Sequence, residues 1–157
     1  MTMLSKNSKF NTSIKILIGT FLLMLVGPFS FAKMPNSTSP DAAEVYFIFP
    51  QDGSVFDRAN ASEIEIVFGI KGMEISHAGI AIPNSGHHHL LINIETLPDL
   101  TMPLPASEQV RHFGKGQTRT TIKLGQGKHR LQLVLGNHVH IPHNPPVMSK
   151  VIEIEVK

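Results

Sequence analysis

The segment that decides the fold is Glu63-Ile64-Glu65-Ile66-Val67-Phe68-Gly69-Ile70. Every second residue from Ile64 to Ile70 is large and apolar, so one face of an extended chain would be apolar here. Alternation with a period of two is typical of a strand that buries one face in a sheet. This segment therefore indicates a β-rich core, and the rest of the chain can be interpreted outward from it.

Short runs of the same kind lie on both sides of this segment, separated by glycine, proline and asparagine. The predicted strands cover 45–49, 63–70, 79–82, 87–95, 117–124, 129–135 and 151–156. The segment 97–111 contains three prolines and is predicted to be a long crossing loop. Strands at this spacing, without a helical period, predict an all-β, immunoglobulin- or fibronectin-like antiparallel sandwich of about seven strands. A half-barrel would have a similar strand count and stays open.

The N-terminal segment has the pattern of an export signal. Lys6, Lys9 and Lys15 accompany an apolar run over 14–26, and Ser30-Phe31-Ala32 fits a small-x-small cleavage site. We expect residues 1–32 to be a signal peptide cleaved near Ala32, 33–43 to be a flexible spacer, and 44–157 to be a histidine-rich β-sandwich domain. This predicts a periplasmic or secreted protein without a stable membrane anchor. An uncleaved N-terminal anchor is the alternative.

Charge and cysteine content narrow the possible partners. The whole chain has 14 Lys and Arg against 12 Asp and Glu. Three of the lysines lie in the predicted signal and no acidic residue does, so 14 − 3 leaves 11 basic against 12 acidic residues. A nearly neutral domain without basic runs is not expected to bind nucleic acid. The chain has no cysteine, which excludes disulfides and leaves imidazole, carboxylate and thioether as metal ligands.

Histidine is the unusual feature of the composition. All nine histidines lie between His77 and His143, and most of them are grouped in the runs 87–89 and 138–143. Imidazole is the commonest protein ligand for transition metals. Copper, zinc and nickel suit sites rich in nitrogen, and the sequence does not choose among them.

Strand parity indicates which histidines share a face. In the strand that starts at His87, Leu90 and Ile92 form the better core face, so His88 should face the core and His87 and His89 the opposite side. His138 and His140 are also two residues apart and are predicted to share a face. Two such pairs at neighbouring strand ends can surround one ion. The first candidate ligands are His87, His89, His138 and His140, and the second choices are His88, His112 and His143.

The sequence favours two function classes and leaves a third open, a metal-dependent enzyme, which would need a pocket with an open coordination position. One is an exported binding domain for a transition metal, copper or zinc, or for another small ligand. The other is a non-catalytic interaction or structural module, docking another exported protein, in which the histidines only organise loops. No catalytic residue is predicted, because no serine lies in a G-x-S-x-G motif and no paired carboxylates are apparent.

Four blocks of sequence together resemble a known bacterial family. They are Gly86-His87-His88-His89-Leu90-Leu91-Ile92, His112-Phe113-Gly114-Lys115-Gly116-Gln117-Thr118, Gly127-Lys128-His129-Arg130-Leu131-Gln132-Leu133, and the segment from His138 to Ser149. The chain from about Val45 to Val156 resembles the family called domain of unknown function 4399. The resemblance implies a small exported domain and implies no activity or site residue.

Overall fold

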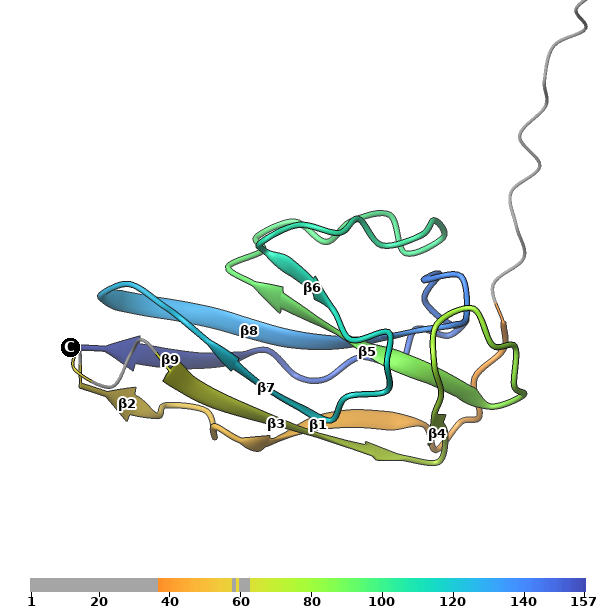
Figure 1. The fold of residues 1–157 in the computed structure, drawn as a ribbon, viewed down its shortest axis with the longest axis horizontal. Helices are drawn as coiled ribbons and strands as arrows, with labels where there is room; N and C mark the ends of the chain where they lie inside the picture. Colours follow the sequence, from red (N-terminus) through yellow and green to blue (C-terminus); the bar gives the residue numbers. More distant parts are fainter. Residues whose placement is uncertain (1–36, 58, 60–62) are drawn as a thin grey trace, which may run out of the picture. The chain divides into compact units, whose positions relative to one another are not determined.

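In the computed structural model, which describes residues 37–57, 59 and 63–157, the alternating segment forms a strand as predicted. The described residues contain nine strands: β1 (Glu44–Phe49), β2 (Val55–Phe56), β3 (Ile64–Lys71), β4 (Glu74–Ile75), β5 (Ser85–Ile92), β6 (Val110–His112), β7 (Arg119–Ile122), β8 (Gly127–Gly136) and β9 (Ile152–Val156). The all-β prediction is confirmed (Figure 1).

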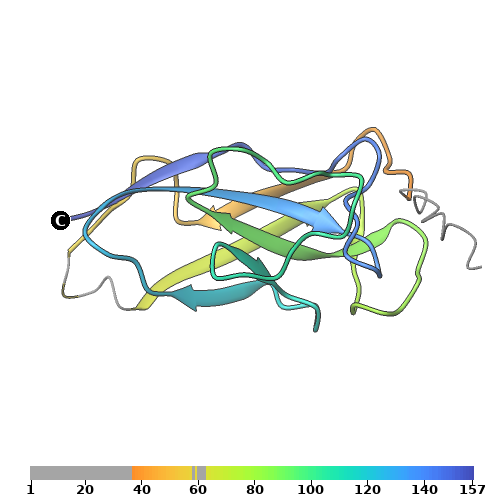
Figure 2. The ribbon, with the colours of Figure 1, turned by 90° about the horizontal axis from the view of Figure 1, so that it is seen from above.

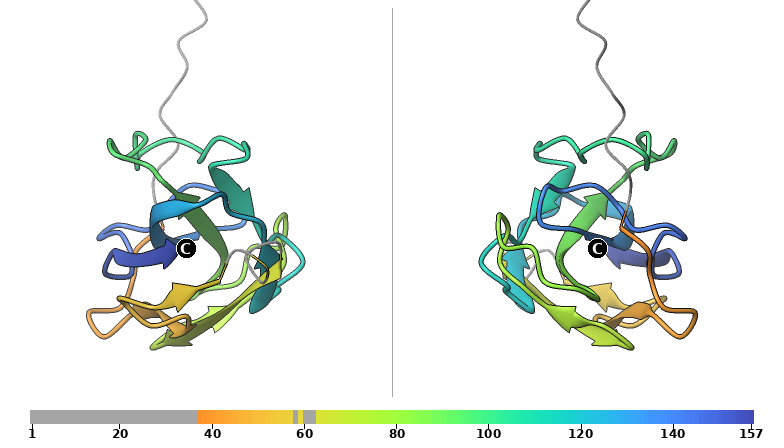
Figure 3. Two further views of the ribbon diagram at one scale, coloured as in Figure 1. Left: turned by 90° about the vertical axis from the view of Figure 1, so that its left-hand side faces the viewer. Right: turned by 90° about the vertical axis from the view of Figure 1, so that its right-hand side faces the viewer.

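The strands form two sheets. The smaller has the order β1-β3-β7, and the larger has the order β2-β9-β8-β5-β4, with β6 also paired to β5. Figure 3 shows the sheets end on, with the larger one curled toward the smaller. The prediction of purely antiparallel pairing is wrong for two short strands. The two-residue strands β2 and β4 pair in parallel with β9 and β5.

The main apolar core lies between the two sheets. Ile64, Ile66 and Phe68 of β3 are buried there, as their alternation predicts, and they pack with Leu90 of β5 and Leu133 of β8. Burying each such side chain contributes about 1.5–3 kcal/mol, so this layer holds the sheets together without a disulfide.

A second, smaller core covers the outer face of the larger sheet. The segment between β5 and β6 runs over β5 and β8 in Figures 1 and 2, and its Leu104 is buried with Leu91, Val110 and Val134. All eight residues of β5 are therefore buried. The sequence pattern predicted only one buried face for this strand, because it could not show that a distant loop covers the other.

One predicted strand is wrong. Residues 79–82 form no strand, and Ile80 and Ile82 are exposed. Gly79 has a positive φ of 82° and Pro83 follows closely, so this stretch turns where a strand would continue.

The predicted signal peptide lies outside the described residues, as do residues 33–36. The described part of the predicted spacer is tied to the domain by hydrogen bonds. Asn144 donates its backbone N–H to the Ser37 carbonyl at 2.9 Å, and Ser39 Oγ donates to the Pro145 carbonyl at 2.7 Å. Within the described ranges, no helix is long and apolar enough to cross a membrane.

Candidate metal centre

The outer face of β5 supplies the first two side chains of a histidine cluster. His87 and His89 lie two residues apart on this strand, both fully buried, with ring centroids 4.8 Å apart. His88, between them, packs on the other face with its ring centroid 5.1 Å from that of Phe68. The parity prediction for all three residues is confirmed.

The third side chain comes from β6. His112 pairs directly with His89 in the antiparallel register, and their ring centroids lie 5.3 Å apart. Gly114 makes room for this ring, because a Cβ at that position would lie 2.5 Å from His112 Nε2. His112 is exposed, so the cluster meets solvent on this side.

The fourth side chain comes from the turn that follows β8. Gly136, the last residue of β8, pairs with His87, and its missing side chain leaves space for the ring of His89. His140 then lies in the left-handed region with φ 68°, which costs a non-glycine residue free energy and needs support from its surroundings. A turn in this conformation directs His140 back over β5.

Asn137 provides much of that support. Its Oδ1 accepts the backbone N–H groups of Val139 and Ile141 at 3.0 and 3.1 Å, and its Nδ2 donates to Ser37 Oγ at 3.1 Å. The Leu104 N–H, from the crossing segment, also donates to the His140 carbonyl at 3.0 Å. The turn is therefore held from both sides, and the His140 ring is held with it.

Replacing Asn137 by alanine should loosen this turn. Because one buried and one partly buried N–H group would lose their acceptor, we expect Asn137→Ala to lower the free energy of unfolding by about 1–3 kcal/mol. Urea denaturation measures this change. Asn144→Ala, at an exposed asparagine close by, is the control and should change stability by less than about 0.5 kcal/mol. Equal losses in the two variants would contradict the role given to Asn137.

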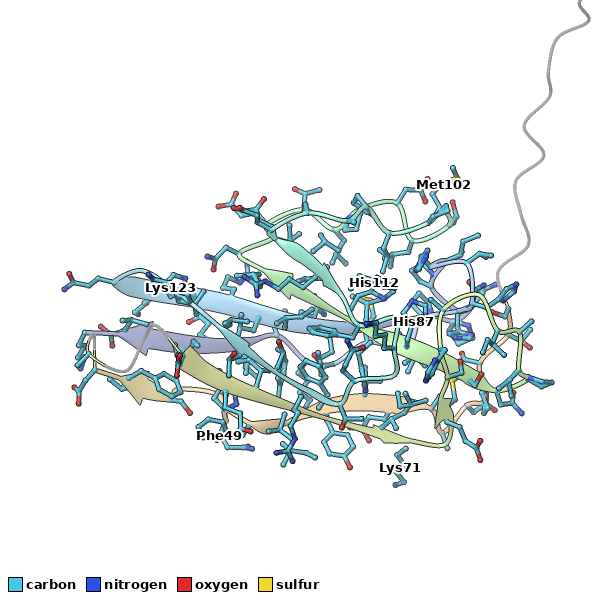
Figure 4. The ribbon with its side chains drawn as sticks, in the orientation of Figure 1. Phe49, Lys71, His87, Met102, His112 and Lys123 are labelled. Carbon is cyan, nitrogen blue, oxygen red and sulfur yellow. The ribbon has the colours of Figure 1, made fainter. Side chains whose placement is uncertain are left out.

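The four rings converge on one point. Each of His87, His89, His112 and His140 offers a nitrogen, and these nitrogens all lie within 4.8 Å of one another. His87 Nε2 and His140 Nδ1 are 3.0 Å apart, so one of them carries the proton that it donates to the other. Figure 4 shows His87 and His112 side by side where β5 and β6 meet.

These distances suit a first-row transition metal. Ligand nitrogens 2.0–2.1 Å from a tetrahedral zinc ion lie about 3.3 Å from each other, and His87 Nε2 and His140 Nδ1 are already near that separation. The separations of the other nitrogens, at most 4.8 Å, are larger than this and would have to shorten around an ion. The group contains no carboxylate, and neutral imidazoles favour copper, zinc or nickel over calcium or magnesium.

Burial favours the neutral form of three of these imidazoles. It lowers the pKa of His87 to about 3, with further lowering from His112 and His140, and it lowers the pKa of His89 to about 3 with help from His87. Burial and His140 also lower the pKa of His112. A neutral ring keeps a lone pair that can bind a cation, so protons compete weakly with a metal at His87 and His89 even in mild acid.

Of the predicted site residues, the structure brings together His87, His89, His140 and the second choice His112. His138 lies outside this group, because residues 137–140 turn and do not continue the strand on which its pairing with His140 rested. It lines a cavity of about 290 Å³ with Asn84 and His143.

The other two second choices also lie outside the four-histidine group. His88 faces the core, where burial lowers its pKa to about 4. His143 is buried beside Gly86, with its Nδ1 3.1 Å from Ser37 Oγ. Gly114, Gly136 and Asn137, which shape the site, carry no pattern that marks them in the sequence.

Fold and site together define a small all-β domain with four converging histidines on the outer face of its larger sheet. This chain belongs to the family described as domain of unknown function DUF4399, whose model matches residues 66–157, more than half of the sequence. The matched segment includes all four histidines. The resemblance noted in the sequence is thereby confirmed. Comparison with curated proteins and with solved structures gave no match.

Proposed function

We propose that this protein is an exported metal-binding domain that holds one copper or zinc ion through His87, His89, His112 and His140. The observation that carries the proposal is the approach of four imidazole nitrogens to within 4.8 Å of one another. Four imidazole nitrogens gathered from three separate segments are an unusual arrangement for a fold to maintain without a ligand.

Burial adds a second argument. Three imidazoles of the β5 run are fully buried, and burying a polar ring without a partner costs roughly 1–3 kcal/mol. Nitrogen atoms of His87 and His89 are buried without a hydrogen-bond partner among the described residues. A bound metal would offset part of the cost of burying these rings through the nitrogens that face it, of which His87 Nε2 is one.

The proposal includes location and scaffold. We place the protein in the periplasm or outside the cell, after cleavage near Ala32, on the strength of the sequence pattern of residues 1–32. We assign the scaffold to the immunoglobulin-like sandwiches, and two sheets around one core support this. Copper(II) is expected to bind more tightly than zinc or nickel, because nitrogen sites follow that order.

Calorimetric titration of the chelator-stripped protein with Cu(II), Zn(II) and Ni(II) tests the proposal. We expect one ion per chain with a dissociation constant below about 10 μM, or about −7 kcal/mol. His112→Ala removes an exposed ligand with little effect on packing, and should weaken binding by more than the roughly 10- to 100-fold that an outer-shell change costs.

His138→Ala is the matched control, because this histidine is close in sequence to His140 but outside the group. It should bind metal as the unaltered protein does. If no metal binds below about 10 μM, the histidines only organise loops and the protein is an interaction module. Equal losses in His112→Ala and His138→Ala would place the site elsewhere.

A further inference from the structure

Two buried polar atoms beside the cluster lack a hydrogen bond. They are His87 Nδ1 and Ser76 Oγ, and neither has a partner among the described residues. Ser76 is 5% exposed and His87 is fully buried. Buried polar atoms are nearly always paired, so each of these atoms calls for a partner.

The sheet register places these two residues opposite each other. β4 and β5 pair in parallel, with Glu74 opposite Ser85 and Ile75 opposite Gly86. The Ser76 N–H donates to the Gly86 carbonyl at 2.8 Å, which continues the ladder one residue beyond β4. In a parallel ladder this bond puts Ser76 opposite His87, on a neighbouring strand about 4.8 Å away.

Both side chains also point to the same face. Ile75 packs against the core between the sheets, so Ser76, the next residue, faces the outer side. His87 faces that side too, together with the other three rings of the cluster. The hydroxyl of Ser76 is therefore a neighbour of the His87 ring on the cluster face.

The chemistry of a metal-bound imidazole explains why a hydroxyl would lie next to His87. His87 Nε2 is the atom that faces His140. When Nε2 binds a metal, Nδ1 keeps its proton and needs an acceptor, and such acceptors fix the ring's tautomer and orientation. A serine hydroxyl can accept this bond.

We propose that Ser76 is a positioning residue of the metal centre. In the metal-loaded protein its hydroxyl accepts a hydrogen bond from His87 Nδ1–H, which neither atom makes in this structure, and thereby directs His87 Nε2 to the ion. This inference rests on the proposed function, because it assigns a role within the same site. It adds an outer-shell residue, outside the histidine runs, that no spacing in the sequence indicates.

Zinc affinity of the purified protein, measured by competition with a chelator, tests the proposal. Ser76→Ala should weaken zinc binding by about 10- to 100-fold, and Ser76→Thr, which keeps the hydroxyl, should restore most of it. Ser85→Ala is the matched control. Ser85 is a buried serine on the same face of β5, but its Oγ donates to the Ile82 carbonyl at 2.9 Å, so its loss should leave zinc affinity unchanged.

Two further readouts separate positioning from a general loss of structure. The Nδ1–H proton of His87 should give a slowly exchanging NMR signal in the zinc-loaded protein, and Ser76→Ala should abolish its protection. In a His87→Ala background, Ser76→Ala should cost no additional affinity, because its partner is gone.

The outcomes distinguish the two proposals. If the unaltered protein binds no zinc, copper or nickel, the metal site itself is wrong. If it binds zinc and Ser76→Ala binds equally well, the metal site stands and the role of Ser76 is wrong. Equal losses in Ser76→Ala and Ser85→Ala would also overturn the inference.

Discussion

The metal-free protein should lose on the order of 5 kcal/mol of stability when the pH is lowered from 7 to 5. His87, His88 and His89 are fully buried, and burial lowers their pKa values to about 3, 4 and 3. In the unfolded chain they titrate near 6.5. The unfolded state then binds more protons below pH 6.5, so stability falls as pH falls, by about 2 kcal/mol per ring down to pH 5. The loss should end near pH 3–4, where the folded rings are protonated as well.

Urea denaturation at several pH values between 7 and 3, with and without zinc, measures this dependence. A metal concentration 100 times the dissociation constant should add about 2.7 kcal/mol at pH 7. Most of that gain should persist at pH 5, because the pKa values of His87 and His89 in the folded protein lie well below this pH. A stability that does not change with pH would mean that these rings are accessible to protons in the folded state, against the buried cluster described above.

His88→Leu should raise the free energy of unfolding of the metal-free protein by about 1–3 kcal/mol at pH 7. Both ring nitrogens of His88 are buried without a partner among the described residues, and the ring lies against Phe68 in the core. Leucine has a similar volume and carries no polar atom. The gain should grow by about 2 kcal/mol at pH 5, because the variant no longer has this proton-linked penalty.

His129→Leu is the control for that substitution. Both ring nitrogens of His129 have partners, since Nδ1 lies 3.0 Å from Asn93 Nδ2 and Nε2 lies 2.7 Å from the Gly125 carbonyl. Replacing the His129 ring by leucine should therefore not stabilise the protein.

Zinc affinity should be unchanged by His88→Leu, because the His88 ring faces away from the cluster. A destabilised His88→Leu variant would show that the buried ring makes a favourable contact that its surroundings do not reveal.

The sequence by itself determined the β class and the faces of the histidine run. Alternation over 63–70 predicted β3 and its buried residues, and parity alone separated His87 and His89 from His88. These features are local, because successive side chains of an extended chain point to opposite sides wherever the strand ends up.

Only the tertiary structure decided which other histidines complete the site. His112 joins because β6 pairs with β5 so that His112 lies opposite His89, a register set between segments more than twenty residues apart. His140 joins and His138 does not, because Asn137 closes a turn where strand parity no longer applies. The burial of Leu91 and the place of Ser76 opposite His87 also depend on partners distant in sequence. Period and composition record what one segment prefers, whereas a four-ligand site depends on how separate segments pack against each other.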